Sequence, residues 1–202
     1  MADPTTRPAY ATRAVETTRG LLTYAELAPL LAERVQRVQE AITRGDHDSA
    51  SPGRDLVCAF HAAICADLVP EWAGRWRSVA VVVGSHEPPL PHEVPLRMHD
   101  YEADLGVRLE ALADHPELLP ETLAFAEGRL LSIHPFRDFN GRVTRLFLPW
   151  LLRRLELPPV DLVPTDAAGT ATYLNALRAA DRADWCPLAA IWEQRLATPF
   201  GS

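Results

Sequence analysis

The chain has 202 residues, of which 48% are hydrophobic and 23% are charged, and its formal net charge is −7 at pH 7. The length suits one globular domain with a buried core, and the composition is that of an ordinary soluble protein. The acidic balance argues against general binding to nucleic acid or to an anionic membrane. Three cysteines without C-x-x-C spacing predict reduced thiols and a cytoplasmic location. We also expect no signal peptide and no transmembrane helix, because no apolar run is long enough.

Residues 1–50 are expected to form a tail and a helical extension ahead of the main domain. The stretch 11–20 predicts a short helix that Gly20 ends. Apolar residues at helical spacing predict an amphipathic helix over 24–44, and Thr23 and Glu26 match a capping box ahead of it. Pro29 would either kink this helix or move its start to a later residue.

Residues 51–202 are expected to form the main domain. Ser51 and Pro52 suit the first positions of a helix that Pro70 stops. The proline-rich stretch 78–95 opens with the β-favouring run Val79–Val83, which predicts a small hairpin or flap rather than part of a large sheet. Further helices are expected over 96–114, 120–133, 165–180 and 186–197. The predicted fold class is therefore mainly α with one short β element.

The most informative segment is HPFRDFNGRVTR, which runs from His134 to Arg145. It holds an imidazole, a carboxylate, an asparagine–glycine pair and three arginines. The residues that follow have apolar side chains at the 3.6-residue period, so this polar cluster lies on a loop that leads into a helix. The free N–H groups and the dipole of a helix N-terminus favour an anion. Such a set of groups suits binding of a polyphosphate with a metal and activation of a hydroxyl.

This segment resembles the active-site motif of the Fic (Fic/Doc) family, H-x-F-x-(D/E)-G-N-G-R-x-x-R, and Phe139 stands where the family usually has its first glycine. Two other segments are similar to the family, WAGRWR at 72–77 and YLNALRAADRADWCPL at 173–188. The resemblance covers residues 51–195. It implies a Fic fold, in which a helical bundle surrounds the motif helix and carries a short β-hairpin flap.

The resemblance also implies a protein adenylyltransferase, a nucleotidyltransferase that moves AMP from ATP, with Mg²⁺, to a Ser, Thr or Tyr hydroxyl. A lone histidine is more often structural than catalytic, but the setting of His134 favours a general base. A neutral imidazole with a reference pKa of about 6.5 suits that role. Asp138 could cap the following helix or bind Mg²⁺, and the resemblance favours the metal. Phe136 is expected only to pack in the core.

The positions after Asp138 are expected to hold the nucleotide. Asn140 and Gly141 would let backbone N–H groups approach a phosphate closely. Arg142 and Arg145 lie three residues apart on one helix face, and they would bind the β- and γ-phosphates.

Two further residues match family positions that border the adenine. These are Tyr173 and Asp181, although a core tyrosine and a surface aspartate are equally good interpretations. The resemblance implies that the target protein is bound along the flap, residues 79–92, as an added strand. Formation of a homo-oligomer is left open.

Separate hypotheses concern Glu16 and Phe139. Thr12 and Glu16 fit the start of the inhibitory pattern (S/T)-x-x-x-E-(G/N), which implies that Glu16 pairs with Arg145 and occupies the γ-phosphate position. Phe139 is expected to have a negative φ, with its ring outside the phosphate site. A positive φ would favour the alternative of a catalytically inactive nucleotide-binding regulator. Another alternative is transfer of a different group on the same fold, as in a Doc-like kinase or in UMP or phosphocholine transfer.

Overall fold

The computed structural model describes residues 14–198. A short antiparallel hairpin comes first, with strands β1 (Ala14–Thr17) and β2 (Gly20–Thr23). Short 3-10 turns, Pro91–Glu93 and Pro116–Leu118, lead into two of the helices. The α-helices in this part of the chain are α1 (Tyr24–Arg44), α2 (Arg54–Cys65), α3 (Val94–Ala111), α4 (Leu119–Ile133), α5 (Asn140–Arg154), α6 (Ala167–Ala180) and α7 (Cys186–Ala197). The expected mainly α fold class is confirmed.

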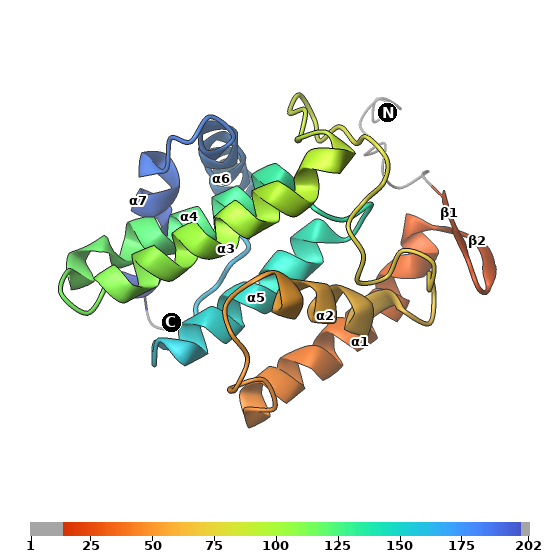
Figure 1. Ribbon diagram of the computed structural model, residues 1–202, viewed down its shortest axis with the longest axis horizontal. Coiled ribbons are helices and arrows are strands. Elements are labelled where there is room, and N and C mark those ends of the chain that lie inside the picture. The colour runs from red at the N-terminus through yellow and green to blue at the C-terminus, as the bar shows by residue number, and fades with distance from the viewer. Residues whose placement is uncertain (1–13, 199–202) are drawn as a thin grey trace.

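Helix α5 passes through the middle of the bundle (Figure 1). It packs against α1 and α2 on one side and against α4 on the other, while α3, α6 and α7 pack against α4. Helix α5 is buried around most of its circumference, as expected for a helix with apolar residues on several faces. Its fully or almost fully buried apolar side chains are Val143, Leu146, Phe147, Leu148, Trp150, Leu151 and Leu152.

Helix α1 begins at the predicted residue. Thr23 is its N-cap, and the capping box with Glu26 is present in both directions. Pro29 lies inside the helix without ending it, and Gly45 closes the helix with a φ of 87°, a left-handed conformation that glycine adopts without strain. The buried face of α1 shares one hydrophobic core with the later helices.

The predicted helix over 11–20 is wrong where the structure describes it, because residues 14–23 form the hairpin. Gly20, the first residue of β2 after the turn at Thr18 and Arg19, has a φ of 94°, which a residue with a side chain would adopt only under strain. Thr18 ties the hairpin to the end of α2, since its N–H donates to Leu68 O at 2.9 Å and its hydroxyl to Asp67 O at 2.6 Å. Tertiary contacts thus favour strands over a helix here.

The expected hairpin in the flap, residues 79–92, is also wrong. This segment is a loop with one isolated bridge, in which Val83 and His86 exchange hydrogen bonds of 3.0 and 2.9 Å. Prolines at 88, 89 and 91 cannot donate to a ladder, so no second strand extends past the bridge. In residues 14–198 the hairpin lies at the N-terminal end instead.

Helix α2 differs from its prediction at both ends. Its N-cap is Gly53 and its first residue is Arg54, each two residues later than the predicted Ser51 and Pro52. The helix ends at Cys65, well before Pro70. A Cβ added at Gly53 would lie 2.1 Å from Glu102 Oε1, so the flexible Glu102 side chain would have to shift. No helix among residues 14–198 is both long and apolar enough to cross a membrane.

Candidate active site

The motif loop joins the end of α4 to the start of α5. His134 is the C-cap of α4, with φ 49° and ψ 60°, and Asn140 is the first residue of α5. The side chain of Asn140 closes the loop, because Phe136 N donates to its Oδ1 and its Nδ2 donates to Phe136 O, both at 2.9 Å. Asn140 is only 4% exposed, so its amide shapes the loop while its backbone lines the cavity described below.

A buried histidine that the sequence analysis did not single out, His61 of α2, supports this loop. Its ring stacks on the fully buried ring of Phe136, with centroids 3.9 Å apart and planes at 5°. Gly74 N donates to its Nδ1 at 2.8 Å, so Nε2 carries the proton and donates to Asp138 O at 3.3 Å. Burial lowers the pKa of His61 to about 4, which keeps the ring neutral. An isolated histidine in an apolar helix was the only signal in the sequence.

Arg77 fixes the other end of the loop. It is 3% exposed, and its Nε donates to His134 O at 2.8 Å while its backbone N–H donates to Pro135 O at 2.9 Å. Its guanidinium also donates to Val79 O at 3.2 Å and to Pro89 O. The negative end of the α4 dipole favours a cation here. Arg77 therefore holds the flap against His134, a role that the WAGRWR segment did not reveal.

The motif residues meet at a cavity of about 600 Å³. Gly141 faces its open space, because a Cβ added there would meet no atom within 4 Å. The first turn of α5 has N–H groups without intrahelical acceptors, which suits an anion. The cavity is lined by Tyr24, Ala25, Ala28, His134, Asp138, Phe139, Asn140, Gly141, Arg142 and Arg145. The structure thus brings together six of the predicted site residues and adds Tyr24.

Two arginines make this cavity positive. Arg142 is half-buried, and burial lowers its pKa most, with Asp138 acting in the opposite direction and Arg145 in the same one. A guanidinium remains charged despite such a shift. Arg145 is exposed at the mouth of the cavity. Both cations and the N-terminus of α5 therefore act on the same space, as binding of a polyphosphate requires.

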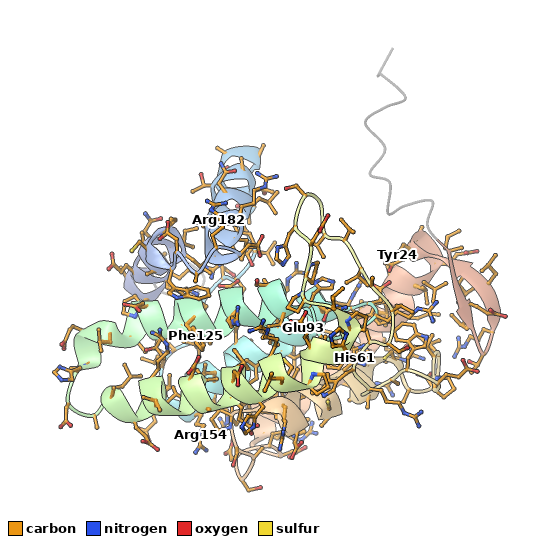
Figure 2. All side chains as sticks on the ribbon, turned by 45° about the horizontal axis from the view of Figure 1, so that its top comes forward. Tyr24, His61, Glu93, Phe125, Arg154 and Arg182 are labelled. Atoms are coloured by element: carbon orange, nitrogen blue, oxygen red, sulfur yellow. The ribbon has the colours of Figure 1, made fainter. Side chains whose placement is uncertain are left out.

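Both carboxylate oxygens of Asp138 accept hydrogen bonds. Phe139 N donates to Oδ1 at 2.7 Å, and the Tyr24 hydroxyl donates to Oδ2. Phe139 is the N-cap of α5 and no side chain caps this helix, so the capping role considered for Asp138 is wrong. Figure 2 shows Tyr24 at the start of α1, beside the hairpin.

The donor set allows a test of whether Mg²⁺ fits. No cluster of three or more His, Cys, Asp or Glu side chains suits a metal ion among the described residues. Mg²⁺ is usually bound by one or two carboxylates together with phosphate oxygens and water. Asp138 at a cavity that favours anions therefore fits an ion that arrives together with phosphate oxygens, whereas residues 14–198 offer no cluster that would hold an ion by itself.

The negative φ predicted for Phe139 is wrong, because its φ is 61° and its ψ is 11°. This left-handed conformation costs a residue with a side chain about 1–2 kcal/mol. The ring is 3% exposed and stacks on Trp72, with centroids 5.5 Å apart and planes at 28°. Burial and stacking of the ring offset the strain, so the loop holds a conformation that glycine would adopt freely.

Tyr173 and Asp181 lie outside this cavity. The Tyr173 hydroxyl donates to Glu127 Oε1 at 2.5 Å, and its ring lines a separate cavity between α6, α7 and the loop before α6. Asp181 faces the flap, with its Oδ2 3.5 Å from His86 Nδ1. Neither residue lines the motif cavity, although Arg145 is near enough to act on the Tyr173 hydroxyl through its charge.

Glu16 is also separate from Arg145. It is an exposed residue of β1, and it lines a cavity of about 390 Å³ with Arg137 and Asp138. No ion pair joins Glu16 to Arg145 in the described part of the chain. Thr12, the other residue of the proposed inhibitory pattern, lies outside the described residues, and the helix expected to carry the pattern is not formed at Glu16.

Comparisons with known proteins agree with this geometry. The model of the Fic/DOC family matches residues 51–152, about half of the chain. The "Protein adenylyltransferase Fic" of Nematostella vectensis is 34% identical over 123 residues, which cover 60% of this chain but only 27% of that protein. The chain thus spans less than a third of the length of this curated relative.

Two solved structures share the fold at low sequence identity. The N-terminal FIC domain of Bep8 from Bartonella sp. 1-1C is 13% identical with a TM-score of 0.68, and the match covers 90% of each chain. BepC from Bartonella tribocorum, with bound AMPPNP, is 16% identical with a TM-score of 0.65, and the match covers 91% of this chain and 92% of that one. The expected fold is confirmed, and the chain belongs to the Fic/DOC family.

Proposed function

We propose that the protein is an adenylyltransferase that moves AMP from ATP to a hydroxyl of a target protein. The observation that carries the proposal is the cavity at which His134, Asp138, the N-terminus of α5, Arg142 and Arg145 meet. These groups would supply a base, a metal ligand and a polyphosphate site in one place. The relative named as a protein adenylyltransferase supports this choice of transferred group.

His134 would act as the general base. Its imidazole takes the proton of the target hydroxyl, and the hydroxyl oxygen forms a bond to the α-phosphorus of ATP. The bond between the α-phosphorus and the oxygen bridging to the β-phosphate breaks, and pyrophosphate leaves with both electrons of that bond. Arg142 and Arg145 would bind the β- and γ-phosphates through paired N–H donors. Mg²⁺ held by Asp138 would neutralise charge on the phosphates.

The target segment would lie along the flap, residues 79–92. The Val82 side chain is 69% exposed, and past the Val83–His86 bridge the loop has no further strand partner. Because Arg77 ties this loop to His134, a segment bound there would be presented to the base.

We further propose a cytoplasmic location, which the free thiols of Cys58, Cys65 and Cys186 support.

Mass spectrometry of the chain after incubation with ATP and Mg²⁺ tests the proposed reaction. A mass increase of one AMP on the chain or on a target would support adenylyl transfer. An added phosphate would instead indicate a Doc-like kinase, and UTP or a choline nucleotide as donor would test the remaining transfers. The inhibitory role of Glu16 stays a prediction for the same assay, in which a strong rise in self-modification of Glu16→Gly would support it.

The second candidate is a nucleotide-binding regulator without catalysis. The observation that favours it is the positive φ of Phe139, because a strained residue at the anion site could disturb the position of the phosphates. Phe139→Gly separates the two functions. Recovery of transfer by an otherwise inactive chain would identify a lost activity, whereas an active wild type would exclude the regulator.

A further inference from the structure

Tyr24 lies 114 residues before Asp138, yet its hydroxyl donates to the Oδ2 of that residue. Its ring also lines the motif cavity. We propose that Tyr24 is a positioning residue of this site, which holds the Asp138 carboxylate in the orientation that accepts a divalent cation bound to a nucleotide. The inference rests on the proposed function, because that function gives Asp138 its role.

The bonds to Asp138 orient its carboxylate and leave room for a cation. Phe139 N donates to Oδ1 at 2.7 Å, and Tyr24 donates to the other oxygen. Donors on both oxygens, one from the loop and one from α1, oppose rotation of the carboxylate. An ionised carboxylate has about four lone-pair sites, so a cation can still bind beside these two donors. Tyr24 thus orients the group without blocking it.

The support of Tyr24 is rigid. It is the first residue of α1 and lies within the capping box, in which Thr23 N donates to Glu26 Oε2 at 2.8 Å. Leu27 and Leu31, on the next turns of α1, are fully buried. The helix therefore fixes where the hydroxyl lies, and the loop must adapt to it. This makes α1 a part of the site, although it precedes the segment that the family model matches.

Tyr24→Phe tests the proposal, because it removes the hydroxyl and keeps the ring. The probe is Mn²⁺, whose binding in the presence of AMPPNP is followed by electron paramagnetic resonance. Groups that orient a metal ligand typically change metal affinity by about 10- to 100-fold when removed, and we expect a loss in this range. Tyr101→Phe is the matched control, since its buried hydroxyl donates to Ala126 O at 3.0 Å and Tyr101 does not line the cavity, and it should leave Mn²⁺ affinity unchanged.

Hydrogen exchange gives a second readout that needs no metal. Loss of the Tyr24 hydroxyl should loosen Asp138 and speed exchange of the Phe139 amide, which donates to it. The same amide should be unaffected by Tyr101→Phe. Equal melting temperatures of Tyr24→Phe and wild type would show that the variant is folded.

Three outcomes would overturn the proposal. Unchanged Mn²⁺ affinity in Tyr24→Phe, with binding lost in Asp138→Ala, would show that Tyr24 does not act on the site, and the proposed function would stand. Tighter Mn²⁺ binding in Tyr24→Phe would mean that the hydroxyl competes with the cation. A wild type that binds no Mn²⁺ with AMPPNP would overturn the inference and the proposed function together.

Discussion

The ring of Phe139 stacks on the indole of Trp72, with centroids 5.5 Å apart, while the backbone of Phe139 has a φ of 61°. A side chain that is rarely placed in this conformation is thus held there by packing. Aromatic pairs contribute about 0.5–1.5 kcal/mol beyond the area they bury, which is close to the strain of the left-handed backbone. The departure from the family motif is therefore accommodated by a residue of another segment.

This relationship predicts that a glycine variant is more stable than an alanine variant at position 139, the reverse of the usual order. Both Phe139→Ala and Phe139→Gly lose the ring, but only alanine keeps the strain, so the alanine variant should be less stable by about 1 kcal/mol. Urea unfolding measures the difference. Phe136, which is buried and is not among the positive-φ residues, is the control, because there alanine should be the more stable. The same order at both positions would contradict a positive φ at Phe139.

Stability should depend on pH through His61. Its pKa is about 4 in the folded protein and about 6.5 in the unfolded chain. The unfolded chain binds more protons than the folded protein between these values. The stability that the neutral His61 contributes is therefore complete above about pH 6.5 and is lost as the pH falls toward 4. Cys65, which faces the ring, stays a neutral thiol because burial raises its pKa to about 12.

Urea unfolding of wild type and His61→Gln at pH 7 and pH 5 measures this effect. Wild type should lose about 2 kcal/mol more than the variant over this interval. The exposed His115 provides the control, and His115→Gln should follow wild type. Identical pH dependence of wild type and His61→Gln would show that His61 is already protonated, or equally solvated, in the folded state.

Glu127 should be essential for stability. Its buried carboxylate accepts from Tyr173, from Trp192 Nε1 at 2.8 Å and from Arg195 at 2.9 Å. Glu127→Ala leaves a buried guanidinium unpaired, which typically costs about 3–5 kcal/mol. Thermal unfolding measures the loss, and Glu121→Ala, which breaks a more exposed ion pair with Arg108, should cost about 1 kcal/mol or less.

The same network predicts the behaviour of Tyr173→Phe. Removing this hydroxyl should lower stability by about 1 kcal/mol and leave the affinity for AMPPNP unchanged, because the hydroxyl is bound to Glu127. Calorimetric titration measures the affinity. A clear loss of AMPPNP binding at unchanged stability would instead return Tyr173 to the adenine site that the resemblance implied.

Replacement of His134 should abolish transfer without abolishing nucleotide binding. Loss of a general base typically lowers the rate by about a hundred- to ten-thousand-fold. Asparagine is the sharper substitution, because His134 has a φ of 49° and asparagine tolerates this conformation better than alanine. The transfer rate and AMPPNP affinity of His134→Asn are the measurements. A folded variant with the wild-type rate would exclude His134 as the base.

The sequence by itself determined the features that act within a turn or two of the chain. The period of apolar residues located the helices, and Thr23 with Glu26 located the start of α1, since a capping box joins residues three apart. The motif also predicted which residues would share a loop and a helix N-terminus, because His134 and Arg145 lie within one short segment. Each of these predictions depends on local geometry, and local geometry is determined by residues that are close together in the sequence.

Only the tertiary structure decided how distant segments complete the site. Arg77 holds His134, His61 supports Phe136, and Tyr24 holds Asp138, and each contact joins helices or loops whose relative placement depends on the packing of the whole core. The φ of Phe139 and the hairpin over 14–23 follow from the same cause. Local preferences favoured a negative φ and a helix, but burial of a ring against Trp72 and hydrogen bonds to the end of α2 favoured the observed conformations. Packing energies of a few kcal/mol exceed local preferences of about one, which is why these positions could not be predicted from the sequence.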